Sequence, residues 1–145
     1  MSLPDFTETG DLPSGIHRAT LRETVERFGT ATPRRKVMTL RLERIYRLAA
    51  TSHLVRFVVF GSFVTARPEP NDVDVFLLMA DSFDVGQLTG DARLLFEHAT
   101  AQAHFGASVF WVRRLAAFGG EQATIEHWQI KRDGSRRGIV EIIGE

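Results

Sequence analysis

The first third of the chain carries the apolar spacing of helices. Thr20 and Glu23 form a capping box in which each side chain can satisfy a free backbone N–H, and this predicts a short helix ending near Phe28, before Gly29. Pro33 then opens a longer helix. Apolar residues recur in it near the helical spacing: Val37, Leu40, Ile45, Leu48 and Ala49. The arginines of the same segment indicate a solvated face: Arg34, Arg35, Arg41, Arg44 and Arg47.

Buried strands are predicted in the middle of the chain. Residues 54–60 are apolar and β-branched apart from Arg56, and residues 72–79 become wholly apolar after two acids. A helix over residues 91–104 and a third strand over residues 107–112 come next. The core residues expected in that helix are Leu94, Leu95, Phe96 and Ala99.

The C-terminal segment has the pattern of a short helix followed by a closing hairpin. Residues 120–128 predict the helix. Two strands, over residues 128–132 and 138–143, are expected to pair around Asp133-Gly134, which is a strong turn dipeptide.

The order of the elements predicts the fold class. Residues 1–19 contain prolines, glycines and scattered polar residues, which indicates an extended leader lying over a single domain at residues 20–145. The predicted order is helix, strand, strand, helix, strand, helix and hairpin. This order favours an α+β fold (a mixed α/β sheet) with the helices packed mainly on one face.

Composition narrows the class of protein. The chain has 145 residues, 43% of them hydrophobic, which suits one globular domain with a complete core. Lys plus Arg and Asp plus Glu number 18 each, so strong attraction of the whole surface to nucleic acid is not expected. The lack of cysteine excludes disulfides and Cys-based zinc sites. No apolar run approaches the ~20 residues that span a bilayer, and residues 1–15 lack a secretion signal, so we expect a cytoplasmic protein away from membranes.

A small-residue turn and a pair of acids mark the candidate site. Gly61 and Ser62 end the first predicted strand, and Asp72 and Asp74 open the second. Side chains at i and i+2 of a strand share a face, so the two carboxylates project together, roughly 6.5–7 Å apart along the strand. Their repulsion is on the order of 3 kcal/mol at an effective dielectric of about 20. A divalent cation removes this repulsion, and Mg²⁺ bound to carboxylates keeps positions for water and phosphate.

This combination resembles the signature of the DNA polymerase β-like nucleotidyltransferase superfamily. That signature is an apolar residue followed by Gly and then Gly or Ser, a short connection, and two acids alternating with two apolar residues. The matching residues are Phe60, Gly61, Ser62, Asp72, Val73, Asp74 and Val75. The resemblance covers roughly residues 40–112. Residues 12–17 and 132–140 are also similar to the leader and tail of a group of small bacterial proteins.

The resemblance implies a minimal, single-domain bacterial enzyme with a nucleotidyltransferase-like sheet. Such an enzyme moves a nucleoside monophosphate from an NTP to a hydroxyl of a protein, RNA or small-molecule acceptor. Asp72 and Asp74 would be catalytic and would bind Mg²⁺ (or Mn²⁺), while Gly61 and Ser62 would contact the triphosphate. Small members of the superfamily often work with a partner chain, and some belong to toxin–antitoxin or defence pairs.

The superfamily also has a third carboxylate on a later strand, and Ser108 stands at the position that we align with it. Three later acids are alternatives for this role: Glu121, Glu126 and Glu141. If the role is vacant, the chain is a catalytically impaired module that binds nucleotide or a partner protein. A metal-dependent glycosyltransferase is a third hypothesis, because paired Asp residues also hold nucleotide sugars, but the Gly61-Ser62 turn and the short chain favour the first.

Basic side chains around the predicted C-terminal turn have two interpretations. They form an ordinary polar hairpin tip, or they clamp a triphosphate or a nucleic-acid backbone, and they are Lys131, Arg132, Arg136 and Arg137. Arg67, between the turn and the acids, has the same two interpretations. The aromatic residues of the C-terminal half are interpreted as core rather than as platforms for stacked bases: Phe105, Phe110, Trp111 and Trp128.

Overall fold

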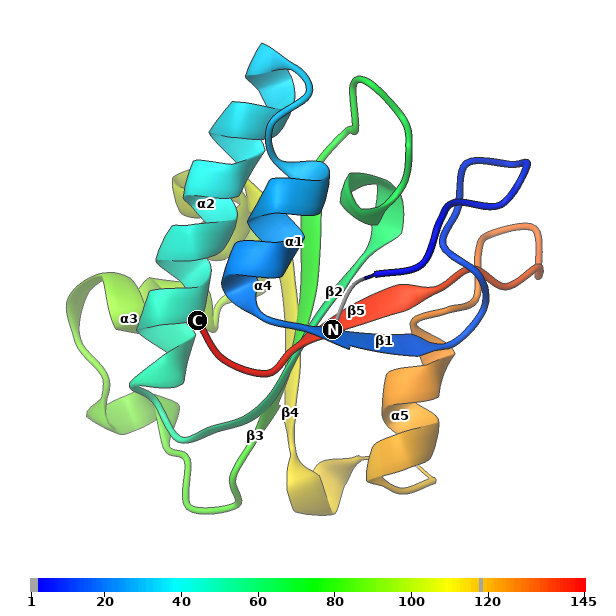
Figure 1. The fold of residues 1–145 in the computed structure, drawn as a ribbon. Helices are drawn as coiled ribbons and strands as arrows, with labels where there is room; N and C mark the ends of the chain where they lie inside the picture. Colours follow the sequence, from blue (N-terminus) through cyan, green and yellow to red (C-terminus); the bar gives the residue numbers. More distant parts are fainter. Residues whose placement is uncertain (1–2, 118) are drawn as a thin grey trace.

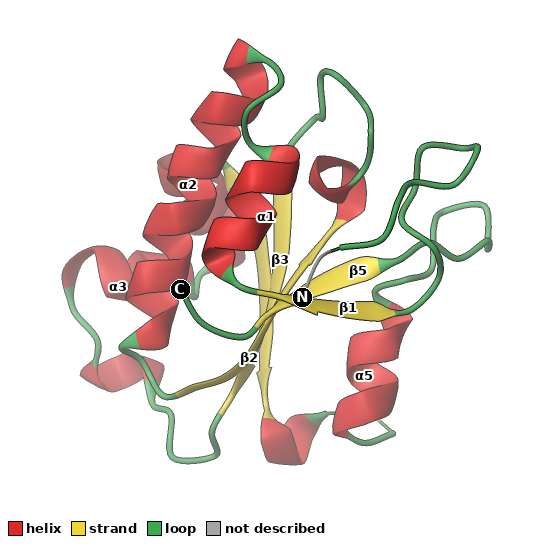
Figure 2. Cartoon of the chain, in the orientation of Figure 1, coloured by secondary structure: helices red, strands yellow, loops and turns green. Residues whose placement is uncertain are grey.

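The computed structural model describes residues 3–117 and 119–145, so the first two residues of the predicted leader lie outside the described residues. The described residues form a five-stranded sheet and five α-helices, as Figure 1 and Figure 2 show. The strands are β1 (Ile16–Ala19), β2 (Leu54–Phe60), β3 (Val73–Met79), β4 (Ala107–Arg113) and β5 (Ile139–Ile142). The helices are α1 (Leu21–Phe28), α2 (Pro33–Ala50), α3 (Gly90–Leu95), α4 (His98–Phe105) and α5 (Glu121–His127).

Both ends of the sequence contribute to one mixed sheet. The strands lie in the order β1-β5-β2-β3-β4. β2 runs antiparallel to β3 and to β5, whereas β1 pairs with β5, and β4 with β3, in parallel. This mixture of strand directions with interspersed helices makes the chain an α+β protein, as predicted.

The two faces of the sheet are covered unequally. Phe57 and Val59 of β2 join one large hydrophobic cluster with residues from α1 to α4. Val58, between them, points to the other face and joins a smaller cluster with Ile125 of α5. The prediction that helices pack mainly on one face is therefore confirmed, and Figure 1 shows α5 on the side opposite α1 and α2.

The helix predicted over residues 91–104 is interrupted. Two shorter helices, α3 and α4, replace it, and Glu97 between them has an extended backbone. Phe96 lies at the break: its ring packs edge-on against Trp111, and its carbonyl oxygen accepts the Trp111 indole N–H at 2.9 Å. This tertiary contact competes with the local helical pattern and ends α3. Ala99, which lies in α4, is exposed and does not belong to the core, contrary to the prediction.

The C-terminal turn forms, but the strand after it pairs elsewhere than predicted. The Lys131 N–H donates to the Ser135 carbonyl at 2.8 Å, and the Arg137 N–H donates to the Gln129 carbonyl at 2.9 Å. These bonds close a hairpin loop. The next strand, β5, pairs with β2 and β1 instead of with residues 128–132. All four residues of β5 are buried, which a two-stranded hairpin at the surface would not achieve.

The predicted leader contributes to the fold. Its last four residues form β1 at the edge of the sheet, and Leu12 is buried in the main core. Asp11, also buried, forms an isolated antiparallel bridge with Thr65, in the connection between β2 and β3. Within residues 3–117 and 119–145, no helix has the length and apolar character needed to cross a bilayer.

α2 buries Ile45 and Ala49, as its sequence pattern predicts, and Leu48 packs against the same core, but the rest of its buried stripe differs from the predicted one. Met38, Leu42 and Ile45 are buried, whereas Val37 and Leu40 are 48% and 68% exposed. Both sets recur near the helical spacing, so periodicity alone does not distinguish them. Contact with the sheet decides which stripe is buried.

Candidate functional site

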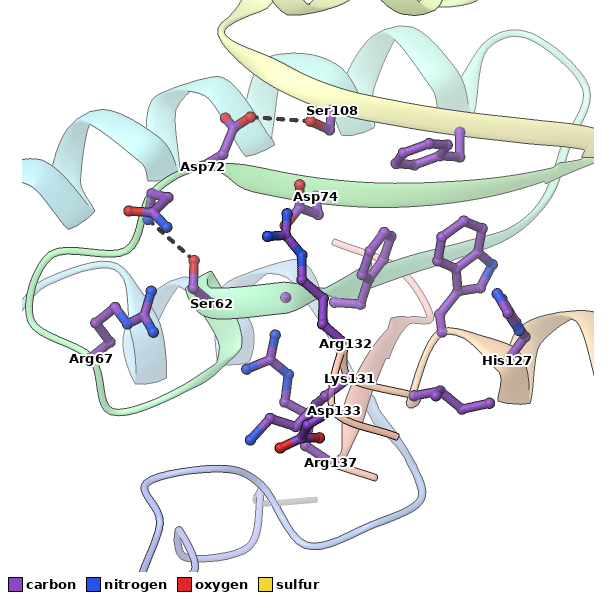
Figure 3. Close-up of a pocket in the computed structure, with 16 residues that line it drawn as sticks. Ser62, Arg67, Asp72, Asp74, Ser108, His127, Lys131, Arg132, Asp133 and Arg137 are labelled. Carbon is purple, nitrogen blue, oxygen red and sulfur yellow. Dashed lines mark hydrogen bonds between the residues drawn. The ribbon is translucent and has the colours of Figure 1, made fainter. Parts of the chain in front are cut away.

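A cavity of about 750 Å³ opens on the face of the sheet that carries α5. Its walls come from the ends of β2 and β3, from β4, and from the segment that follows α5. Figure 3 shows two acids along one rim and basic side chains across from them. The structure brings these predicted site residues together in its lining: Gly61, Ser62, Arg67, Asp72, Asp74, Lys131 and Arg132.

Asp72 and Asp74, the acid pair, lie at the start of β3. Val73 between them is fully buried in the cluster on the helix-covered face, so strand alternation places both acids on the cavity face. In the sheet, Asp74 is paired with Phe60 of β2 and with Ser108 of β4. Asp74 is therefore held by strands on both sides, and Asp72 lies directly before β3.

Gly61 brings the end of β2 against Asp74. Its φ is +80°, a backbone conformation that residues with a side chain rarely adopt, and it begins a short 3-10 turn over Gly61–Val64. A Cβ on Gly61 would overlap Oδ2 of Asp74 and lie 3.1 Å from its Cγ. Backbone conformation and space therefore both require glycine at this position.

The acid pair carries negative charge that its surroundings compensate incompletely. Burial, and to a smaller extent the charge of Asp72, raises the pKa of Asp74 from an ordinary value of 3.8 to about 6. The hydroxyl of Ser108 and the charge of Arg137 act in the opposite direction. Ser108 Oγ also donates to Oδ2 of Asp72 at 3.2 Å (Figure 3). Two carboxylates in this state fit a hard divalent cation.

The position that the superfamily resemblance assigns to a third acid holds the hydroxyl of Ser108. Ser108 pairs with Asp74 in the sheet, and in the described part of the chain none of the three alternative acids lines the cavity. Glu141 and Glu121 bond to Arg56 instead, at 2.6 and 3.4 Å. Residues 3–117 and 119–145 contain no cluster of three or more His, Cys, Asp or Glu suited to a metal ion. A cation at the acid pair would therefore have two carboxylates from the protein.

The loop after α5 supplies a basic rim, formed by Lys131, Arg132 and Arg137, which all line the cavity. Lys131 Nζ lies 3.2 Å from Asp11 Oδ2, and Arg137 Nη1 lies 3.6 Å from Asp11 Oδ1. The leader thereby anchors the loop. Figure 3 shows Arg132 reaching toward the acid pair. Among the described residues, Arg136 does not belong to the lining, so the structure separates it from the other basic residues of the turn.

A buried arginine of α2 anchors the connection between Gly61 and the acid pair. Arg35 is 3% exposed, and its guanidinium donates to the carbonyl oxygens of Phe63, Thr65 and Arg67 at 2.6–3.1 Å. It also donates to the carbonyl of Phe28 at 2.9 Å, at the end of α1. The helical pattern predicts a solvated position for Arg35, and this prediction is wrong because the carbonyl groups of the loop converge on it.

The far end of the same connection is held in a similar way. Arg34 donates to the carbonyl oxygens of Pro70 and Asn71, at 2.5 and 2.9 Å. The Asn71 N–H in turn donates to the Ser62 hydroxyl at 3.2 Å (Figure 3). The loop that presents Ser62 and Arg67 to the cavity is therefore fixed at both ends by neighbouring residues of one helix.

A family match covers the whole of this site. A family model matches residues 4–143, which is nearly the complete chain. The chain belongs to DUF6932, a family of unknown function. Comparisons with curated proteins and with solved structures gave no match. The DUF6932 match extends from the leader to β5 and includes all the residues described as lining the cavity.

Aromatic side chains complete the cavity of this DUF6932 chain. Phe105 is buried, and Trp111 packs against the main core, as their interpretation as core residues predicts. Phe110 is 37% exposed and lines the cavity together with Trp128, so a place in the core is the wrong interpretation for Phe110. Strand alternation carries the signal, because Phe110 lies two residues after Ser108 and shares its face.

Replacing Gly61 with alanine is expected to destabilise the DUF6932 protein by about 2–3 kcal/mol, because the strained φ and the overlap with Asp74 act together. Urea denaturation measures the loss. The matched control is Gly134→Ala, where φ is +87° and a Cβ would meet no described atom within 4 Å. The control carries the backbone cost alone, about 1 kcal/mol.

The contact with Asp74 has its own test in a double-mutant cycle. In an Asp74→Ala background, the Gly61→Ala substitution no longer meets Oδ2 and Cγ, so its cost is expected to fall toward that of the Gly134→Ala control. An equal cost of Gly61→Ala in both backgrounds would show that Asp74 does not restrict this position.

Proposed function

We propose that this DUF6932 protein is a Mg²⁺-dependent nucleotidyltransferase that moves a nucleoside monophosphate from an NTP to a hydroxyl of a protein, RNA or small molecule. The main support is the contact of Asp74 with the Gly61 bend, opposite a basic rim in one cavity. The cavity volume of about 750 Å³ is in the range of small-molecule sites. The proposed setting is the cytoplasm, with the acceptor on a partner chain, as in a toxin–antitoxin or defence pair.

Different residues of the cavity would bind different parts of an NTP and its metal ion. Asp72 and Asp74 would bind Mg²⁺ (or Mn²⁺), which when bound neutralises charge on the triphosphate. The Ser62 hydroxyl and the backbone N–H groups of the turn that begins at Gly61 donate to phosphate oxygens. The basic rim and Arg67 contribute positive charge to the same phosphates. Hydrogen bonds from Arg35 of α2 to the carbonyl oxygens of Phe63 and Thr65 keep this turn in place before the ligand binds.

The proposed reaction exchanges one phosphorus–oxygen bond for another. The acceptor oxygen bonds to the α-phosphorus, the bond from that phosphorus to the bridging oxygen breaks, and pyrophosphate leaves with the electron pair. The basic rim stabilises the charge that grows on the leaving oxygens. The hydroxyl proton passes to water, because Ser108 occupies the place from which a carboxylate would accept it.

A second candidate function is a binding module that holds a nucleotide or a partner protein without turnover. Ser108 supports this candidate, since a hydroxyl beside Asp74 neither adds a negative ligand nor acts as a general base at neutral pH. The nucleotidyltransferase and a nucleotide-binding module share the same bound state and differ in whether pyrophosphate is released.

The deciding experiment incubates the full chain with Mg²⁺, a bacterial extract as the source of acceptors, and each of the four α-labelled NTPs. We expect labelled acceptor and pyrophosphate to appear in equal amounts. The Asp72→Asn/Asp74→Asn double variant should lose both signals, whereas Asp5→Asn, an exposed carboxylate away from the cavity lining, should keep them. Binding of NTP without pyrophosphate release would select the binding module. Failure to bind any NTP would contradict the nucleotidyltransferase and the nucleotide-binding form of the module, and would leave a module that binds a partner protein.

A further inference from the structure

An aromatic wall adjoins the acid pair on the same face of the sheet. It consists of Phe60, Phe110 and Trp128, whose ring centroids lie 4.5–6.1 Å apart with interplanar angles of 31–43°. All three side chains line the cavity that contains the acid pair and the basic rim. Charged and aromatic surfaces therefore face one continuous space.

Exposed apolar side chains in the wall and beside it indicate a surface for a ligand. Phe110 is 37% exposed and Ile130, which also lines the cavity, is 45% exposed, although both are large apolar side chains. Apolar groups left in contact with water inside a cavity favour a ligand with an apolar or aromatic part. The acid pair and the basic rim favour a ligand that is also strongly anionic.

The register of the sheet sets the distance between these two parts. Phe60 pairs with Asp74 across β2 and β3, and Ser108 pairs with Asp74 across β3 and β4. Phe110 is the next residue of β4 on the face of Ser108, one step of about 6.5–7 Å along the strand. A ribose bridges a separation of this size between a phosphate and a base. A nucleotide with its phosphates at the acid pair would therefore have its base at the wall.

We propose that the aromatic wall binds the nucleobase of the NTP, an inference that rests on the function proposed for the same cavity. Base–aromatic contact is available to every base, because each has a π-face. Figure 3 places His127 at the end of the cavity away from Asp72, and its ring packs edge-on against Trp128 with centroids 5.4 Å apart. Its imidazole supplies a polar group for the edge of the base.

Calorimetric titration of the full chain in Mg²⁺ tests the base contact directly. The three ligands are ATP, ribose triphosphate and inorganic triphosphate, so that the base and the sugar are removed in turn. The wild type is expected to bind ATP at least about tenfold more tightly than ribose triphosphate. Phe110→Ala should remove most of this difference, and Leu115→Ala should preserve it, since Leu115 is 88% exposed and lies outside the cavity lining.

A fluorescence measurement keeps the test valid if Phe110→Ala does not fold. Trp128 is one of two tryptophans, and a base on the wall should quench its emission. We expect ATP, but not ribose triphosphate, to quench the wild type, and we expect Trp128→Phe to remove this quenching. Equal affinity for ATP and ribose triphosphate would overturn the proposal, and so would a preference for ATP that persists in a folded Phe110→Ala variant.

These outcomes separate the base site from the proposed reaction. A preference for ATP without any transfer leaves the wall as a base site and contradicts the nucleotidyltransferase. Transfer with equal affinity for ATP and ribose triphosphate contradicts the base site alone. That second result is also the one expected if the wall holds a ring of the acceptor instead of the base.

Discussion

The Asp74→Asn variant is expected to unfold at a higher temperature than the wild type at about pH 7.5 without divalent cations. Burial, together with the charge of Asp72, raises the pKa of Asp74 to about 6 in the folded protein. A carboxyl group with a higher pKa in the folded state than in the unfolded state costs stability once it ionises. Stability from this group is complete below about pH 4, is lost as the pH rises through about 6, and is absent above about pH 7.

The size of the gain follows from the same shift. The change from 3.8 to about 6 corresponds to a limit of about 3 kcal/mol at 1.36 kcal/mol per pH unit. Screening by solvent in the open cavity reduces the expected gain to about 1–2 kcal/mol. For a chain of 145 residues this gain raises the unfolding temperature by roughly 3–6 °C. At about pH 4 the two proteins should unfold at nearly the same temperature.

Activity is expected to change in the opposite direction. Asparagine keeps the shape of Asp74 but removes a charged oxygen ligand, so nucleotidyl transfer should fall by about 10³-fold, equivalent to about 4 kcal/mol in the barrier. Mg²⁺ should raise the unfolding temperature of the wild type and have little effect on the variant. Both results together would indicate a site whose function lowers the stability of the fold.

Thermal denaturation with and without Mg²⁺, at three pH values, measures these effects. The control is Asp5→Asn, which changes the net charge equally but removes an exposed carboxylate outside the cavity lining. A lower unfolding temperature for Asp74→Asn than for the wild type at about pH 7.5 would mean that Asp74 forms a stabilising contact, and this would contradict a repelled acid pair.

Local sequence patterns predict most of the helices and strands. They do not predict which strands pair with each other or which elements come into contact. The capping box at Thr20 forms with both of its hydrogen bonds, and Pro33 does open α2. The pairing of β5 with β2 and β1 depends on which strand edge is free after the rest of the sheet has formed, and that is a property of the whole fold. The break at Phe96 has the same origin, since it depends on a contact with Trp111.

In the candidate site, too, some features are predicted by the local sequence and others depend on contacts made only in the complete fold. The acid pair and the Gly61 bend are recognisable because strand alternation and backbone freedom are encoded within a few residues. The aromatic wall is partly encoded, since Phe110 follows Ser108 by one alternation step. Arg35 carries no local signal, because an arginine on an amphipathic helix has the same pattern whether solvent or loop carbonyls receive its guanidinium.

Replacing Arg35 with methionine is expected to destabilise the protein by about 3–4 kcal/mol, more than any other single change considered. Methionine preserves much of the packing of the aliphatic stem, so the loss comes from the guanidinium and from the carbonyl groups that it leaves without a donor. Arg35→Lys should lose less stability, because an ammonium group keeps the positive charge. It does not restore the wild-type stability, because its three donors do not match carbonyl groups that are arranged around a planar guanidinium.

Urea denaturation gives the free energies of unfolding. Arg47→Met on the same helix is the matched control, since Arg47 is exposed and forms surface ion pairs worth less than about 1 kcal/mol.

The loop that Arg35 holds should respond more strongly than the rest of the chain. In Arg35→Lys, which we expect to fold, hydrogen exchange should accelerate most over residues 61–67, where three carbonyl partners of the guanidinium lie. Because this loop presents Ser62 and Arg67 to the cavity, NTP binding should weaken about tenfold while the contribution of the base is unchanged. Exchange that accelerates uniformly, with unaltered binding, would show that Arg35 stabilises the fold in general and has no part in positioning the loop. The buried guanidinium thus connects the stability of α1 and α2 to the geometry of the turn that is proposed to bind phosphate, which is the reason to measure both quantities in the same variants.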